Sequence, residues 1–258
     1  MTPHEIKEQV DRLARDASWP NCPNGGWQYP FGFGFGIEAP TYTPTQRELH
    51  PWRRAVTLSA LDRYFEGRYD RISVLDLGAG ECAFAAGLWE KGVRDITCVE
   101  ARDINIDKAL FVQNVLGCEF KIVKEDVNKF LENDERTYDL VLFMGLLYHL
   151  QDPFNVTKKI AEKTKEISVI ETVLACPSEV VFSNNSDYRP KSAAYYIRIE
   201  NKDGPTAGLS DIELWPTQSA LDYTLYNAGF KRLEDIVPED ANINFYSTKQ
   251  RTLLLAHK

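Results

Sequence analysis

Two acidic residues stand at the ends of two short apolar segments that flank a glycine-rich turn. Residues 73–77 read Ser-Val-Leu-Asp-Leu, and Gly78-Ala-Gly80 follows at once. The second apolar segment, Asp95-Ile-Thr-Cys-Val-Glu100, also ends on a carboxylate. A strand, a Gly-x-Gly turn, a helix and a second strand ending in an acid are typical of a pocket for an adenine nucleoside. The alternative is an ordinary tight turn, in which the glycines only provide backbone freedom.

The carboxylates indicate which nucleoside cofactor would bind. Gly78-Ala-Gly80-Glu-Cys-Ala83 also fits nicotinamide and flavin sites, where a pyrophosphate lies on the turn amides. Asp76 and Glu81 would bring negative charge to that pyrophosphate, which electrostatics disfavours. S-adenosylmethionine (SAM) has no phosphate and carries a sulfonium and an ammonium group, so acids beside the turn suit it. Glu100 would accept hydrogen bonds from its ribose hydroxyls.

Composition limits the partners and the compartment. The chain has 258 residues and a net charge of −8, which disfavours nucleic acid as a partner. No stretch approaches the ~20 apolar residues that a membrane helix needs, and the N-terminal residues predict a charged amphipathic helix, not a signal peptide. The five cysteines form no C-x-x-C pair. We therefore expect reduced thiols, a cytoplasmic protein and no metal site; the oligomeric state stays open.

Periodicity predicts an α/β protein with a mostly parallel, doubly wound sheet. Apolar spacing predicts helices over 3–16 and 52–66, separated by an aromatic, proline- and glycine-rich stretch at 18–51 that is packed down but not helical. Strands and helices then alternate: strands are expected at 72–77, 95–100, 119–124, 138–144, 166–173 and 250–256, and helices at 82–91, 105–115, 127–132, 153–163 and 217–228. We assign 1–70 to a cap segment and 71–258 to the cofactor domain, with an active-site loop at 178–214.

Ligands of open α/β sheets bind at the carboxyl ends of the strands, so the residues there are the candidates for cofactor binding. Asp126 would accept from the adenine amino group while Val127 packs on the ring, although Asp126 could equally cap the next helix. The full predicted set is Asp76, Gly78, Ala79, Gly80, Glu100, Ala101, Arg102, Asp126, Val127, Met144, Gly145 and Tyr148.

The fourth predicted strand leads into the candidate catalytic residues. It runs into Met144-Gly-Leu-Leu-Tyr148-His149, so that Tyr148 and His149 project at the pocket mouth. Histidine is the usual base for removing a proton from a hydroxyl or amine. His149 could instead brace the following loop, because methyl transfer often needs only positioning. Glu171, at the end of the fifth strand, would be a second base or a partner for His149.

These motifs resemble those of class I SAM-dependent methyltransferases. The chain is similar to the branch that contains the bacterial enzyme carboxymethylating the wobble uridine of tRNA, and to its small-molecule relatives. The matching pieces are Val74-Leu-Asp-Leu-Gly-Ala-Gly, Met144-Gly-Leu-Leu-Tyr-His, Glu171-Thr, Pro216-Thr-Gln-Ser-Ala-Leu, Ala228-Gly-Phe and Arg251-Thr-Leu-Leu-Leu-Ala-His-Lys. The resemblance implies a Rossmann-like, seven-stranded sheet with an antiparallel C-terminal edge hairpin. It also implies that Asp76, Gly78, Met144 and Tyr148 line the cofactor site, with Arg251 close by.

One departure from that branch favours ordinary SAM. The tRNA enzyme has an N-terminal lysine that contacts the extra carboxylate of its carboxy-SAM cofactor, whereas the comparable stretch here reads Gly26-Trp-Gln-Tyr-Pro-Phe. Losing one of two cations should remove much of the preference for that carboxylate. We therefore expect in-line methyl transfer to an oxygen or nitrogen of a small, possibly anionic acceptor, with a tRNA-modifying enzyme, a non-catalytic SAM-binding protein and a nicotinamide oxidoreductase as alternatives.

The acceptor would meet aromatic and basic side chains. Arginines could hold an anionic group on it, although arginines more often form surface ion pairs. Aromatic residues of the N-terminal stretch could form a platform for it or only pack the cap. The predicted substrate-binding residues are Trp27, Tyr29, Arg53, Arg189, Tyr195 and Arg251.

Overall fold

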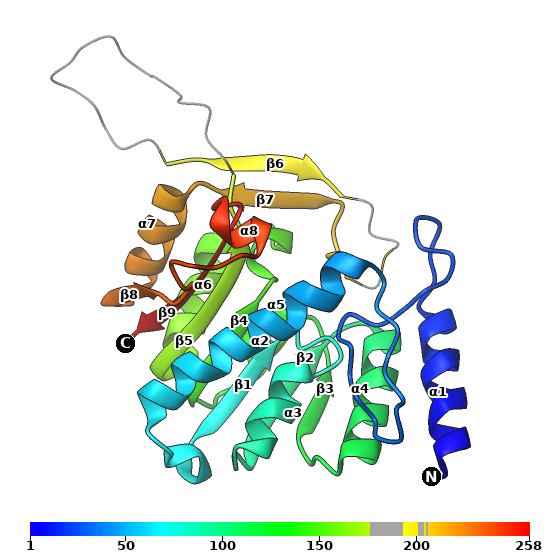
Figure 1. The fold of residues 1–258 in the computed structure, drawn as a ribbon. Coiled ribbons are helices and arrows are strands. Elements are labelled where there is room, and N and C mark those ends of the chain that lie inside the picture. Colours follow the sequence, from blue (N-terminus) through cyan, green and yellow to red (C-terminus); the bar gives the residue numbers. More distant parts are fainter. Residues whose placement is uncertain (176–192, 201–203, 205) are drawn as a thin grey trace, which may run out of the picture.

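A single seven-stranded sheet organises the chain (Figure 1). The structure is a computed structural model, and it describes residues 1–175, 193–200, 204 and 206–258. The strand order is β3-β2-β1-β4-β5-β9-β8, in which β9 runs antiparallel to both of its neighbours and the remaining pairs are parallel. This confirms the predicted doubly wound sheet and its antiparallel edge hairpin. The strands are β1 Ser73–Leu77, β2 Asp95–Glu100, β3 Lys121–Lys124, β4 Tyr138–Met144, β5 Thr164–Val173, β8 Arg232–Asp235 and β9 Arg251–His257.

Helices cover both faces of this sheet, because alternate residues of the buried strands supply two separate apolar surfaces. Val74 of β1 packs with one cluster of apolar side chains, and its neighbour Leu75 packs with the other. The first cluster includes side chains of α1 Pro3–Asp16, α2 Pro44–Phe65, α3 Ala83–Glu90 and α4 Asp103–Leu116. The second includes side chains of α5 Val127–Asn133, α6 Pro153–Lys163 and α7 Gln218–Ala228.

A buried ion pair attaches the aromatic N-terminal stretch to the sheet domain. The Lys108 ammonium, fully buried, donates to Glu81 Oε1 at 2.9 Å, to the Gly26 carbonyl at 2.6 Å and to the Tyr42 hydroxyl at 2.8 Å. The Glu81 carboxylate in turn accepts from the backbone amides of Gln28 and Tyr29. The carboxylate that we expected beside the turn thus holds this stretch in place, which confirms that the stretch is packed down.

The prediction was wrong about where the second helix begins. α2 starts at Pro44, eight residues before the expected start, and it contains Pro51. Thr43 caps the helix by accepting from the Gln46 amide, and a proline in the first turn fits because its missing N–H is not needed there. The proline-rich composition suggested an irregular segment, but capping and packing decide in favour of a helix.

A second, two-stranded sheet lies within the region that we expected to be a loop. β6 Tyr195–Ile199 and β7 Ile212–Pro216 pair antiparallel, with Arg198 opposite Glu213. Figure 1 shows this hairpin extending across the end of the main sheet. The remaining short elements are η1 Arg68–Arg71, η2 Leu147–His149 and α8 Asn244–Ser247. Among the described helices, none combines the length and the apolar character required to cross a bilayer.

Candidate functional site

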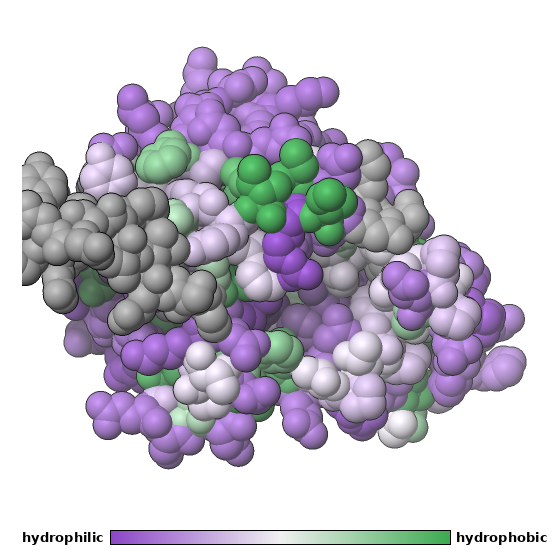
Figure 2. Space-filling model, turned by 90° about the horizontal axis from the view of Figure 1, so that it is seen from above, coloured by the Kyte–Doolittle hydropathy of each residue, from purple (hydrophilic) through white to green (hydrophobic). Residues whose placement is uncertain are grey.

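A cavity of about 900 Å³ opens at the carboxyl ends of the central strands. Seen from above, the molecule is hollowed between largely hydrophilic side chains (Figure 2). The structure brings nearly all predicted site residues to this cavity: Tyr29, Arg53, Asp76, Gly78, Ala79, Gly80, Glu100, Ala101, Arg102, Asp126, Val127, Met144, Gly145, Tyr148, His149 and Arg251 line it.

Three predicted site residues lie elsewhere. Trp27 is fully buried in the N-terminal stretch, where its ring packs on Phe33 and its Nε1 donates to the Val10 carbonyl, so it is a core residue. Tyr195 donates to or accepts from Thr224 and packs on Phe154, away from the cavity lining. Glu171 lies beneath the cavity wall, completely buried. The predicted Arg189 lies outside the described residues.

The glycine turn uses its own backbone amides to bind the second strand. Gly78 and Ala79 both donate to the Val99 carbonyl, at 2.9 and 3.0 Å, and Gly80 donates to Glu100 Oε2 at 2.8 Å. Gly78 and Gly80 have φ values of +67° and +55°, a region that favours glycine. These three turn amides are therefore already engaged within the protein.

The Glu100 carboxylate has both oxygens anchored and still faces the cavity. Its second oxygen, Oε1, accepts from the amides of Ala101 and Arg102, each at 2.9 Å. Burial raises the pKa of Glu100, while these three amide hydrogen bonds oppose that shift. Each carboxylate oxygen can accept more than one hydrogen bond, so the group can also receive hydroxyl donors from a ligand.

Asp76 carries an unpartnered carboxylate oxygen into the same cavity. The residue is 2% exposed, and Oδ2 is buried without a hydrogen-bond partner among the described residues. Burial and the nearby Glu100 raise the pKa of Asp76 to about 7, although Arg53 opposes the shift. A buried acceptor without a donor is costly, and a cationic group of a ligand would satisfy it.

His50 presents an unpartnered donor to the cavity. Its Nδ1 lies 3.0 Å from Arg53 Nη2, and since a guanidinium only donates, Nδ1 accepts and Nε2 carries the hydrogen. Burial and the Arg53 charge lower the pKa of His50 well below its usual value, so the ring is neutral. Nε2 is buried and has no partner within the described part of the chain. Sequence analysis missed His50, because nothing in a helix pattern distinguishes a lining residue from a core residue.

Two arginines share the Glu171 carboxylate at the cavity wall. Arg251 Nε and Nη2 donate to Glu171 at 2.5 and 3.1 Å, Arg53 Nη1 donates to it at 3.1 Å, and the Tyr246 hydroxyl donates at 3.0 Å. Burial alone would raise the pKa of Glu171, but the two guanidinium groups lower it, so the carboxylate is ionised. Gly145, at φ +73°, permits this arrangement, since a Cβ there would lie 3.4 Å from Glu171 Oε2.

Asp126 caps helix α5, which is one of the two roles predicted for it. Its Oδ1 accepts from the amides of Asn128 and Lys129, at 2.9 and 3.3 Å. The residue also lines the cavity together with Val127. Capping therefore does not exclude contact with a bound base.

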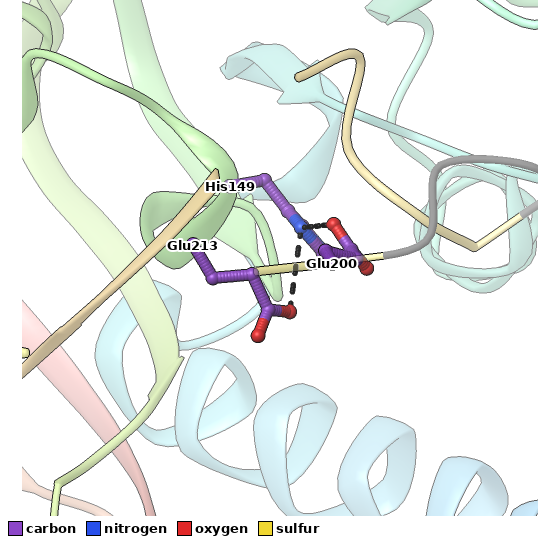
Figure 3. A group of neighbouring side chains, drawn as sticks. All are labelled: His149, Glu200 and Glu213. Atoms are coloured by element: carbon purple, nitrogen blue, oxygen red, sulfur yellow. Dashed lines mark hydrogen bonds and ion pairs between the residues drawn. The ribbon is translucent and has the colours of Figure 1, made fainter. Parts of the chain in front are cut away.

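His149 has two glutamate neighbours that sequence analysis missed (Figure 3). Its Nδ1 lies 2.9 Å from Glu200 Oε2 and 3.8 Å from Glu213 Oε1. Glu171, the expected partner, is instead bound by the arginines. Glu200 and Glu213 lie in the region expected to be a loop, and no motif marks them.

The comparisons with known proteins identify the family to which the chain belongs. A family model described as a methyltransferase domain matches residues 49–250. A tRNA U34 carboxymethyltransferase from Wolinella succinogenes is 21% identical over 188 residues, which is 72% of this chain but only 60% of that protein.

Solved structures share the fold over the whole chain. The N-terminal domain of EvdMO1, determined with S-adenosylhomocysteine (SAH) and D-fucose, is 22% identical, with a TM-score of 0.69 and coverage of 100% of this chain and 97% of that one. Magnesium protoporphyrin IX methyltransferase from Synechocystis PCC 6803, with SAM bound, is 12% identical, with a TM-score of 0.54 and coverage of 99% and 96%. Since the family model spans most of the sequence, the chain belongs to the family of methyltransferase domains.

Proposed function

We propose that this protein transfers a methyl group from SAM to an oxygen or nitrogen of a small, hydroxyl-bearing acceptor. The observation that carries the proposal is that two of the unpartnered polar groups on the residues lining the cavity have opposite character. Asp76 Oδ2 is a buried acceptor, and His50 Nε2 is a buried donor. The α-ammonium and α-carboxylate of an amino acid supply the opposite groups. SAM ends in such an amino acid and contains no phosphate.

The turn amides argue against a pyrophosphate-bearing coenzyme. Gly78, Ala79 and Gly80 each donate within the protein, so they offer no free amides for a phosphate. A pyrophosphate would also approach Asp76 and Glu100, both buried acids. This supports SAM over a nicotinamide cofactor.

The residues of the cavity then have distinct roles in holding the cofactor. Asp76 would pair with the ammonium group, and Glu100 would accept from the ribose hydroxyls. Asp126 and Val127 would contact the adenine, as predicted. SAM supplies an electrophilic methyl on a sulfonium, and the protein needs mainly to align the acceptor with it. Burial raises the pKa of Tyr148, so its phenol is neutral; catalytic roles for Tyr148 and His149 stay predictions.

The Glu171 cluster favours methyl over carboxymethyl transfer. An extra carboxylate on the cofactor would need an available cation. Arg251, the residue that the resemblance implicates, already gives two hydrogen bonds to Glu171, and Arg53 gives a third, while Arg53 Nε keeps no partner among the described residues. Because the N-terminal stretch also lacks the lysine of the tRNA enzyme, we assign ordinary SAM as the cofactor, and the Wolinella relative leaves carboxymethyl transfer to tRNA as the second candidate.

Charge favours a small acceptor without phosphates. Besides the acids at the cofactor end, four more line the cavity: Glu132, Asp152, Glu200 and Glu213. Acids repel the phosphates on which nucleic-acid binding depends. A neutral, hydroxylated molecule fits this lining better than the anionic acceptor considered from sequence. The EvdMO1 domain was determined in the presence of D-fucose, so monosaccharides are the first class to test.

Calorimetry followed by a transfer assay tests the proposal. The chain is titrated with SAH and separately with NADH, and we expect saturation by SAH only. Radiolabelled SAM is then incubated with a panel of monosaccharides, with D-fucose included, and with unmodified tRNA. Label on a sugar supports the proposal, whereas label that reaches tRNA alone, and does so from radiolabelled carboxy-SAM, supports the second candidate. Saturation by NADH without SAH binding would refute both.

A further inference from the structure

Three metal-binding side chains meet at one point of the cavity lining. Figure 3 shows His149, Glu200 and Glu213 pointing toward one another. One atom from each, His149 Nδ1 and one oxygen of each glutamate, lie within 4.8 Å of one another. A first-row divalent ion lies about 2.1 Å from its ligands, so neighbouring ligand atoms are about 3–3.5 Å apart. The observed 2.9 and 3.8 Å from Nδ1 to the two glutamates bracket that spacing.

The β6–β7 hairpin presents both glutamates on the same side. Arg198 pairs with Glu213, and the Glu200 amide donates to the Asp211 carbonyl, so Glu200 lies diagonally across from Glu213. Diagonal neighbours of an antiparallel pair share a face and lie within reach of long side chains. η2 carries His149 to this face. His149 and Glu213 are 64 positions apart in the sequence. They meet because the hairpin packs against η2.

Further contacts hold the two carboxylates in place. The Gly208 amide donates to Glu200 Oε2 at 3.0 Å, and Trp215 Nε1 donates to Glu213 Oε2 at 3.0 Å. Such outer contacts orient metal ligands in known sites. Gly208 also passes so close to the ring that a Cβ there would lie 2.9 Å from His149 Cβ. Any side chain at this position would displace the histidine.

The charge of the cluster favours a cation. Arg198 approaches only the outer oxygen of Glu213, at 3.9 Å. Two carboxylates thus face one imidazole in a largely buried site, and a divalent cation between them would offset their mutual repulsion.

We propose that His149, Glu200 and Glu213 bind one divalent cation, which holds the acceptor by two neighbouring hydroxyl oxygens. Three protein ligands leave coordination positions open for such a chelate. The inference rests on the proposed methyl transfer and extends it. It departs from the sequence-based expectation of no metal site, which looked for closely spaced ligands.

The cation would activate the acceptor for the transfer. A hydroxyl bound to a divalent cation loses its proton more readily, as metal-bound water does. That proton passes to solvent. A bond forms from the acceptor oxygen to the methyl carbon while the sulfur–methyl bond breaks, and the electron pair of the broken bond stays on sulfur. His149 then acts as a ligand, and not as the general base.

A Mn²⁺ titration of the chelator-treated 258-residue chain tests this inference. Electron paramagnetic resonance counts bound Mn²⁺, and we expect one ion per chain. Glu200→Gln and Glu213→Gln should each weaken Mn²⁺ binding at least tenfold, because a neutral amide is a poor ligand. Gly208→Ala should weaken it as well. Glu234→Gln is the matched control, since Glu234 pairs with Arg232 and His257 outside the cavity, and the Mn²⁺ affinity of this variant should stay within twofold.

SAH affinity, measured on the same samples, keeps the two proposals separate. Each variant should bind SAH within threefold of the parent, which shows that the fold is intact. No bound Mn²⁺, or equal binding by the parent and both glutamine variants, would overturn the inference and restore His149 as the candidate base. Failure to bind SAH would instead contradict the proposed function, and the Mn²⁺ titration would still decide the metal site.

Discussion

Replacing Asp76 with asparagine should weaken cofactor binding and stabilise the cofactor-free protein at the same time. The carboxylate is buried, its Oδ2 has no partner among the described residues, and its pKa is raised to about 7. Asp76→Asn keeps the size of the side chain and removes the charge. The ligand loses the partner of its ammonium group, while the protein loses a charge that is costly to bury.

The size of both effects follows from the pKa. A rise of the Asp76 pKa from 3.8 to about 7 means that folding disfavours the ionised carboxylate by roughly 4 kcal/mol. Because the folded pKa lies above the unfolded one, the folded state holds the proton more tightly and stability falls as pH rises from about 4 to 7. An unpartnered amide costs about 1–3 kcal/mol itself, so at pH 8 the variant should gain roughly 1–3 kcal/mol. Loss of a buried charge partner costs binding about 2–5 kcal/mol, or about 30-fold or more in SAH affinity.

Calorimetry with SAH at pH 6 and pH 8 measures the change in affinity, and thermal melting at pH 8 measures the change in stability. At pH 6 only about a tenth of Asp76 is ionised, so wild-type affinity should fall roughly tenfold from its value at pH 8. Asp76→Asn should lack this dependence. Asp139→Asn is the control. Its hydrogen bonds from Ser73 lower its pKa despite burial, so this variant should lose stability and keep SAH affinity. Asp76→Asn affinity within threefold of wild type, or flat wild-type affinity across this range, would refute the reasoning.

Three further variants test the buried charges and the wall of the cavity. Lys108→Met leaves Glu81 buried without its cation, so thermal or urea unfolding should show a loss of about 3–5 kcal/mol; a loss below 1 kcal/mol would contradict the role of this pair in attaching the N-terminal stretch. Glu171→Gln frees Arg251, so competition binding should show a shift of preference from SAM toward carboxy-SAM, and an unchanged ratio would remove the cluster as the reason for choosing methyl. Gly145→Ala places a Cβ 3.4 Å from Glu171 Oε2 at φ +73°, so it should lower the melting temperature and SAH affinity together, whereas Gly92→Ala, at φ +105° with open space around it, should lower only the melting temperature.

The sheet and the cofactor end of the cavity could be read from the sequence because their determinants are local. Buried parallel strands need continuous apolar runs such as 140–143, and a turn that approaches a ligand needs glycine at positive φ. The carboxyl ends of parallel strands share one edge, so Asp76, Glu100 and Met144 had to lie close together once the strands were assigned.

Local composition gave wrong predictions where tertiary contacts determine the structure. Prolines at 44 and 51 suggested an irregular segment, yet the Thr43 cap and burial of one face make it part of α2. Trp27 was predicted to bind the acceptor, but it is fully buried in the core. Burial of a side chain depends on which elements pack against it, and that is not encoded within a short window.

The sequence by itself determined the fold class, the glycine turn and the acids at the strand ends, because each depends on residues adjacent along the chain. Only the tertiary structure decided the partners. Glu171 binds two arginines and not His149, and the β6–β7 hairpin brings Glu200 and Glu213 to His149 instead. Partners of buried charges are chosen by through-space distance and desolvation, and neither quantity exists until distant segments have packed together.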